Sequence, residues 1–143
     1  MSPPTSTRLV SFTLDGRSYG IDVSVVREVL RGLPLTRVPL APKAVAGLVN
    51  LRGQVLTAVD LREQLGLPPR EDGGEPMLVV AHVGGEPVAL LVDSIGSVVD
   101  VDQDQFEPPP ETLVGPARHL VVGAYKLADR LLVSLDVDRA VAA

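Results

Sequence analysis

Four carboxylates in the second half of the chain have a spacing that resembles a set of calcium ligands. Asp100, Asp102 and Asp104 stand at alternate positions, and Glu111 follows at the twelfth position of the same segment. A calcium loop of this kind needs glycine at its sixth position, where the chain has Gln105, and a helix after it, where three prolines stand. The sequence therefore predicts no metal site, and we interpret the aspartates as a solvated strand face that keeps a sheet edge from aggregating.

The remaining residue types with catalytic potential do not form a set. The two histidines, His82 and His119, each lie in an apolar stretch typical of a strand, with no acid or nucleophile nearby. The chain has no cysteine, which excludes disulfides and thiolate metal ligands. Gly84 and Gly85 fit a turn rather than a phosphate-binding loop. Because no roles converge, we expect a protein that is not an enzyme and has no cofactor.

Composition excludes two classes of partner. The 143 residues fit one domain or two very small ones. Net charge is -5 and aromatic residues make up 3%, so the basic surface and stacking platforms of a nucleic-acid binder are missing. No apolar run approaches the roughly 18 residues of a membrane span, so we expect no direct membrane insertion. The start of the chain lacks the apolar core of a signal peptide, which favours a cytoplasmic protein.

Residues 45–61, VAGLVNLRGQVLTAVDL, carry the most specific pattern. Two aliphatic runs flank a polar group, which predicts strand, tight turn and strand, with Gly53 supplying positive φ. Arg52 is the only charge between Lys43 and Asp60. Two interpretations stay open: its fork of donors serves recognition, or it pairs with a carboxylate of its own fold and solvates the turn.

The rest of the first half predicts short elements. Residues 1–7 are expected to be a disordered tail, and residues 9–14 and 18–21 a hairpin. A short amphipathic helix is expected next, capped by Asp22 or Ser24 and ending at Gly32. Its apolar residues would fall on one stripe, formed by Val25, Val26, Val29 and Leu30. Proline-bounded residues 33–38 predict an edge strand. Asp60 and Gly66 delimit a helix over residues 61–65.

The second half begins with a composition break. Residues 68–76, rich in proline, glycine and charge, predict a linker. The expected elements after it are strands at residues 77–83, 88–92 and 95–101, a hairpin at 119–127 and 130–135, and a terminal helix at 136–143. Strands this short, with turns at roughly eight- to twelve-residue spacing, indicate small β-barrels rather than a parallel sheet.

Together these segments resemble the CheW-like family, the chemotaxis coupling proteins. The family signature is a glycine, an apolar pair, Asn-Leu-Arg-Gly, a β run and Asp-Leu-Arg, and the chain matches it at Gly47, Asn50, Leu51, Arg52, Gly53, Asp60, Leu61 and Arg62. Further segments agree in the same order, at residues 19–22, 26–29, 91–95 and 129–132. One departure is Thr57, where relatives often carry a proline. The likeness covers roughly residues 10–141.

The resemblance implies a mostly β fold. Two small five-stranded SH3-like β-barrels would pack side by side, with short helices and a groove between them. One CheW-like domain would span residues 8–143, with a first barrel at about 8–67, the linker at 68–76, a second barrel at about 77–135 and the terminal helix at 136–143. Which strands cross between the barrels is left open.

The resemblance also implies a non-catalytic adaptor. It would couple the cytoplasmic tip of a methyl-accepting chemoreceptor to the regulatory domain of a CheA-type histidine kinase in receptor arrays, for chemotaxis or another motility output. The expected partner-binding residues are Val26, Glu28, Val29, Val49, Asn50, Leu51, Arg52, Gly53 and Val92. The alternative is a free-standing small-barrel binding or structural protein outside chemosensory signalling, which an Arg52 buried in an internal salt bridge, with no apolar groove beside it, would favour.

Overall fold

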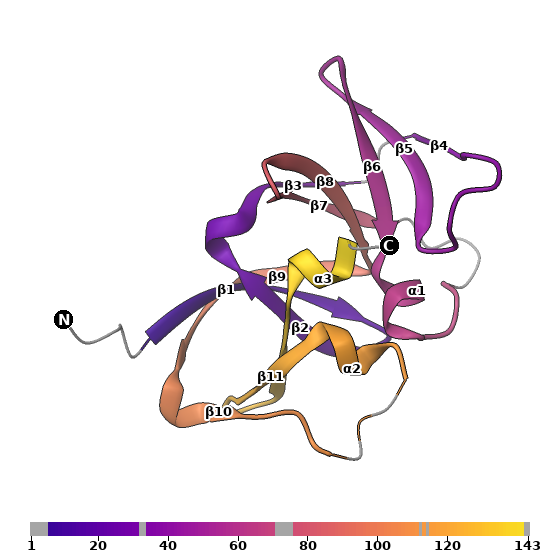
Figure 1. Cartoon of the computed structure of the whole chain (residues 1–143). Coiled ribbons are helices and arrows are strands. Elements are labelled where there is room, and N and C mark those ends of the chain that lie inside the picture. The colour runs from indigo at the N-terminus through magenta and orange to yellow at the C-terminus, as the bar shows by residue number, and fades with distance from the viewer. Residues whose placement is uncertain (1–5, 32–33, 71–75, 112, 114, 142–143) are drawn as a thin grey trace.

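The chain folds into two six-stranded sheets that lie one above the other in Figure 1. The computed structural model describes residues 6–31, 34–70, 76–111, 113 and 115–141. The sheet built from both ends of the chain, which we call the terminal sheet, has the order β10-β11-β12-β2-β1-β9. Its strands are β1 (Ser6–Leu14), β2 (Arg17–Asp22), β9 (Ser94–Asp102), β10 (Phe106–Glu107), β11 (Val121–Lys126) and β12 (Leu131–Leu135).

The second sheet comes from the middle of the chain, and we call it the central sheet. Its order is β3-β7-β8-β6-β5-β4. Its strands are β3 (Val26–Arg31), β4 (Leu35–Thr36), β5 (Val45–Leu51), β6 (Gln54–Asp60), β7 (Met77–Val83) and β8 (Glu86–Val92). The predicted mostly β fold with few short helices is thus confirmed. Each sheet gains a sixth, two-residue edge strand, and among the described residues neither sheet closes on itself by backbone pairing.

The central sheet is an insertion in the terminal sheet. Strands β3–β8 all come between β2 and β9, while β12 returns to pair in parallel with β2. The chain passes between the sheets twice, through the 3-10 turn η1 (Val23–Val25) and through Asp93, the single residue between β8 and β9. Each sheet therefore combines strands from the first half and from the second half of the chain, which answers the question that the sequence left open. The expected boundary at residues 68–76, of which 71–75 lie outside the described residues, falls inside the central sheet.

The prediction of a helix around residues 25–30 is wrong, because Val26–Arg31 is strand β3. It pairs antiparallel with the buried strand β7. A β-bulge adds Arg27 as an extra residue, so that Val26 and Val29, three positions apart, return to one face of the strand. Apolar residues three positions apart on one face are also typical of an amphipathic helix. The pairing with β7, distant in sequence, overrides the local pattern.

The helices are short and mostly lie where the sequence predicts them. Helix α1 (Leu61–Leu65) begins at Asp60, whose carboxylate accepts from the Arg62 amide, and ends at Gly66 in the left-handed conformation. Helix α3 (Val137–Val141) follows Asp136, and residues 142–143 lie outside the described ranges. Of the helices in these ranges, none combines the length and apolar character that crossing a bilayer requires.

Three expectations change at element ends. Helix α2 (Ala117–Leu120) replaces the start of the strand expected from residue 119, because its amides at 118 and 119 bond to the carbonyls of Gly115 and Pro116. The 3-10 turn η2 (Gln103–Gln105) interrupts the acidic segment. Ser6 and Thr7, expected in the tail, belong to β1; residues 1–5, like the expected helix end at Gly32, lie outside the described residues.

One hydrophobic core is shared by the two sheets. It contains Phe12 and Ile21 from the terminal sheet and Val79 and Leu90 from the central sheet, all nearly inaccessible to solvent. A second core lies within the central sheet, and a third lies within the terminal sheet around Leu132. Because burial of apolar surface is the main stabilising term, the shared core makes each sheet a support for the other.

Candidate functional site

The β5–β6 hairpin ends in a two-residue turn, Arg52-Gly53, that projects at the top of Figure 1. Both residues have positive φ, 53° and 85°, as a type I′ hairpin turn requires. The Asn50 Oδ1 accepts a hydrogen bond of 2.9 Å from the Gly53 amide. Asn50 and Gly53 therefore shape the turn, and the turn directs the Arg52 side chain.

Arg52 makes a two-point ion pair with Glu28 of β3. Its Nη1 and Nη2 donate to Glu28 Oε2 and Oε1, both at 2.9 Å. The hydrogen bonds from Arg52 lower the pKa of Glu28 below its ordinary value. The Arg52 side chain is 70% exposed and that of Glu28 is 30% exposed. Arg52 thus pairs within its own fold, as one interpretation expected, while most of its surface faces solvent.

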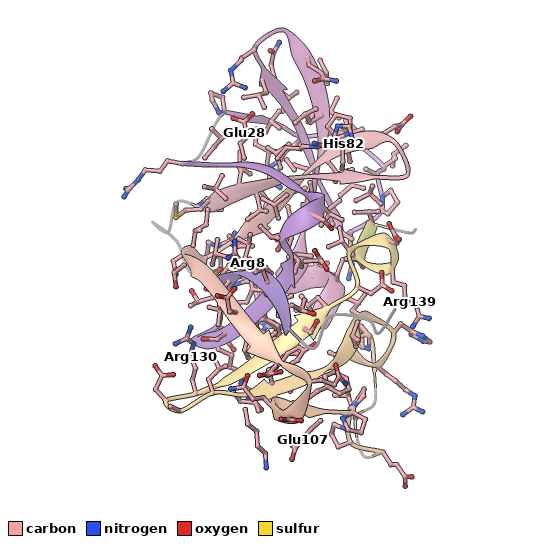
Figure 2. The ribbon with its side chains drawn as sticks, turned by 90° about the vertical axis from the view of Figure 1, so that its left-hand side faces the viewer. Arg8, Glu28, His82, Glu107, Arg130 and Arg139 are labelled. Atoms are coloured by element: carbon pink, nitrogen blue, oxygen red, sulfur yellow. The ribbon has the colours of Figure 1, made fainter. Side chains whose placement is uncertain are left out.

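A shallow cavity of about 220 Å³ opens beside this pair. Figure 2 labels Glu28 and His82 near the same end of the molecule, with Glu107 and Arg130 at the opposite end. The rim of the cavity is polar and its floor is formed by buried Leu56 and Val80. The polar lining residues are Arg27, Glu28, Arg52, Gln54 and His82, and the cavity is also lined by Leu51 and Pro87. Apolar floors with charged rims are typical of protein contact surfaces.

Val26 and Val29 lie on the face of β3 opposite to Glu28. Val26 is paired with Ala81 and Val29 with Val79, two residues of the core shared by the sheets. Directly paired residues share one face of a sheet. Val26 is half-buried against this core, whereas Val29 is 45% exposed. This face of β3 therefore presents an accessible aliphatic side chain next to the inter-sheet core.

Two of the expected partner-binding residues are inaccessible. Val49 is 2% exposed and packs in the core of the central sheet, and Val92 is fully buried in the shared core. Val49 alternates along β5 with exposed Asn50. Strand β8 is paired on both sides, and its neighbouring residues Leu91 and Val92 are both buried, each in a different core. Val49 and Val92 therefore offer no side-chain surface to a partner, whereas Val29 stays accessible. The structure brings together Glu28, Leu51 and Arg52, and Asn50 on β5 bonds to Gly53 in the turn.

A second charged group, centred on Asp93, was not predicted from the sequence. Arg62 Nε donates to Asp93 Oδ1 at 2.9 Å and its Nη2 to Oδ2 at 2.5 Å, while Arg70 donates to Oδ1 from Nε and Nη2. Side-chain exposures are 12% for Arg62, 17% for Arg70 and 21% for Asp93. Arg62 and Asp93 both lie in segments that match the family pattern, which was the one signal available.

Burial and hydrogen bonding act on Asp93 in opposite directions. Burial alone raises the pKa of the carboxyl, but hydrogen bonds from Arg62, the Asp15 amide and Arg70 outweigh it and lower the pKa to about 2. Asp93 is therefore ionised at neutral pH and is held by two guanidinium groups.

The acidic segment considered for calcium has a different arrangement. Asp100 pairs with Arg8 at 2.9 Å across strands β9 and β1. Within the part of the chain that the structure describes, no three His, Cys, Asp or Glu side chains gather in a way that suits a metal ion.

The comparisons with known proteins agree with this geometry. The model of the CheW-like domain matches residues 8–143. The chain belongs to the CheW-like family. It is 28% identical over 130 residues to a probable chemotaxis protein CheW of Rhizobium etli, covering 91% of this chain and 84% of that protein. A chemotaxis protein CheW of Rhizobium meliloti is 29% identical with the same coverage.

A solved structure supports the fold of this CheW-like chain. The crystal structure of the scaffolding protein TtCheW from Thermoanaerobacter tengcongensis superposes with a TM-score of 0.81 at 27% identity, covering 91% of this chain and 88% of that one. Proteins of the CheW-like family are scaffolds or adaptors without catalytic activity, so this CheW-like chain is not an enzyme.

Proposed function

We propose that this chain is a coupling adaptor of a chemotaxis signalling complex, where it holds other proteins together without catalysing a reaction. The observation that carries the proposal is the match of the CheW-like domain to residues 8–143, nearly the whole chain. The relatives named chemotaxis protein CheW support it. The free-standing binding protein considered as an alternative is not favoured, because the Arg52 pair is exposed rather than buried.

The proposed partners are the cytoplasmic tip of a methyl-accepting chemoreceptor and the regulatory domain of a CheA-type histidine kinase, in cytoplasmic receptor arrays. An adaptor with two separate contacts converts the second binding event into an intramolecular one. Two individually weak contacts then suffice for a stable assembly. Two sheets with separate outer surfaces provide room for both contacts.

The receptor tip is assigned to the face of β3 that carries Val26 and Val29. An amphipathic helix binds through apolar anchors, and Val29 offers an accessible aliphatic group beside the shared core. The ion pair of Glu28 and Arg52 lies on the opposite face of β3, at the end of the central sheet where Leu51 also lies. Charges at the edge of a contact mainly set orientation and association rate. The kinase domain is assigned to the ends of the sheets.

The test is a charge placed on this face of β3. Val29→Glu should weaken binding of a receptor signalling fragment by roughly 30-fold or more, the scale of a binding hot spot of about 2 kcal/mol, because the carboxylate must be desolvated. Binding of the kinase regulatory domain should stay unchanged. Calorimetric titration of each partner measures both effects.

The matched control is Val122→Glu on β11, where the native valine is 48% exposed. It introduces the same charge at a similar exposure in the terminal sheet, and receptor binding should persist. If Val29→Glu stays folded and either both partners or neither partner loses affinity, the receptor does not bind at this face.

A further inference from the structure

The two covalent connections between the sheets do not by themselves fix the angle between them. The chain crosses through η1 and through Asp93, and an insertion held at two points can rotate about the line that joins them. Hinges in proteins are a few residues at the ends of elements that absorb such rotation. Asp93, a single residue between β8 and β9, occupies a hinge position.

Asp93 is at the same time the most heavily bonded residue of this junction. Its amide donates to the Thr13 carbonyl at 3.0 Å, and its carboxylate accepts from the Asp15 amide at 2.8 Å. Both partners belong to the β1–β2 hairpin of the terminal sheet. The same carboxylate accepts the forks of Arg62, which lies on α1 directly after β6, and of Arg70. One carboxylate therefore ties the central segment to the terminal sheet.

These hydrogen bonds favour one orientation of the two sheets, which the shared core alone does not. Burial of apolar surface is non-directional and does not by itself select one angle between the sheets. Two-point bonds between guanidinium and carboxylate are directional. Further away, the Gln64 side chain on α1 donates to the Ala140 carbonyl on α3 and adds a second polar contact between the segments. The Asp93 contacts are partly buried, so water competes with them less than at the Glu28 pair.

We propose that Asp93 is a positioning residue that locks the angle between the central and terminal sheets, acting through Arg62. Its backbone is the hinge between the sheets, and the hydrogen bonds of its side chain oppose rotation about that hinge. Without the carboxylate, the shared core still holds the sheets together, but their relative orientation becomes variable. This role is independent of which partners bind the protein.

The experiment uses the absence of cysteine in the chain. Cysteines at Val55 of β6 and Val122 of β11, which are 60% and 48% exposed, place one spin label on each sheet. Pulsed dipolar spectroscopy then gives the distribution of distances between the labels. The full chain should show one narrow distance, and Asp93→Asn should broaden or shift it at a temperature where circular dichroism shows the variant folded.

The control is Asp100→Asn, which removes an aspartate that pairs with Arg8 within the terminal sheet only. It should keep the narrow distance. A role limited to stability would lower the melting temperature of Asp93→Asn without changing the distribution, so an unchanged distribution in the folded variant overturns the proposal. If Asp93→Asn does not fold, Arg62→Gln replaces it, and an unchanged distribution in that folded variant also overturns the proposal.

Discussion

Two arginine–carboxylate pairs of similar geometry lie in different surroundings, and their roles differ accordingly. The Arg52 side chain in the Glu28 pair is 70% exposed, whereas the Arg62 side chain in the Asp93 pair is 12% exposed. Exposed pairs are solvated and screened and contribute little to stability. In a partly buried, multiply bonded pair, removal of one partner is costly because it leaves a charge buried without compensation.

Replacing Arg52 by alanine should therefore affect binding rather than folding. The free energy of unfolding should change by less than about 0.5 kcal/mol, as for most surface substitutions. Affinity for the receptor fragment or the kinase domain should fall, because the orienting charge is lost. Arg8→Ala is the control, since Arg8 is also 70% exposed and paired with an aspartate. A large loss of stability with intact binding would show that Arg52 is structural.

The low pKa of Asp93 predicts a specific acid sensitivity. The folded pKa of about 2 lies below the ordinary 3.8, so the carboxylate stabilises the fold above pH 4, and this contribution is lost as the pH falls from 4 to 2. The shift corresponds to something on the order of 2 kcal/mol. Urea denaturation of the native chain at pH 4 and pH 2.5 should show a steeper loss of stability than for Asp93→Asn. Equal losses in both proteins would contradict the assignment.

At the scale of elements, Gly47 permits the close approach of β4 to β5. Its φ is 154°, and a Cβ built at this position would overlap the carbonyl oxygen of Thr36. Gly47→Ala should lower the free energy of unfolding by about 2 to 4 kcal/mol, because backbone atoms must shift. Chemical denaturation measures this loss.

The control for that prediction is Gly84→Ala in the β7–β8 turn. Gly84 also has positive φ, 60°, but a Cβ there meets no atom within 4 Å. Only the backbone strain, about 1 kcal/mol, should appear. Equal effects of the two substitutions would mean that the contact with Thr36 is unimportant.

Elements set by adjacent residues could be predicted from the sequence, and elements set by distant pairing could not. Helix α1 was predicted because Asp60 and Gly66, which delimit it, stand next to it in the chain. Strand β3 was predicted as a helix because its bulge and its partner β7 become visible only in the folded chain.

The same distinction applies to the candidate site. The Arg52-Gly53 turn was predicted because its signals are local. The burial of Val49 and Val92 depends on strand register, which the pattern of short apolar runs does not give. The contact of Arg62 with Asp93 joins residues 31 positions apart, so matching segments alone did not reveal it.

The molecule as a whole should unfold in one step, because the two sheets share a core. All four aromatic residues, Phe12, Tyr19, Phe106 and Tyr125, belong to the terminal sheet. Tyrosine fluorescence therefore reports the terminal sheet and, through Tyr19, the shared core, while far-ultraviolet circular dichroism reports the strands of both sheets. The two signals should have the same midpoint in urea. Separate midpoints would show that the sheets unfold independently.

The insertion of the central sheet has a consequence for synthesis on the ribosome. Strands β1 and β2 leave the exit tunnel first, yet their neighbours β9 and β12 are made after the whole central segment. The central sheet has all of its strands once Val92 has emerged. Many nascent chains acquire structure from the N-terminal end onward. Because the two sheets share a core, this chain should reach its stable fold only after β12 has been synthesised, when the first hairpin can pair with the last strands.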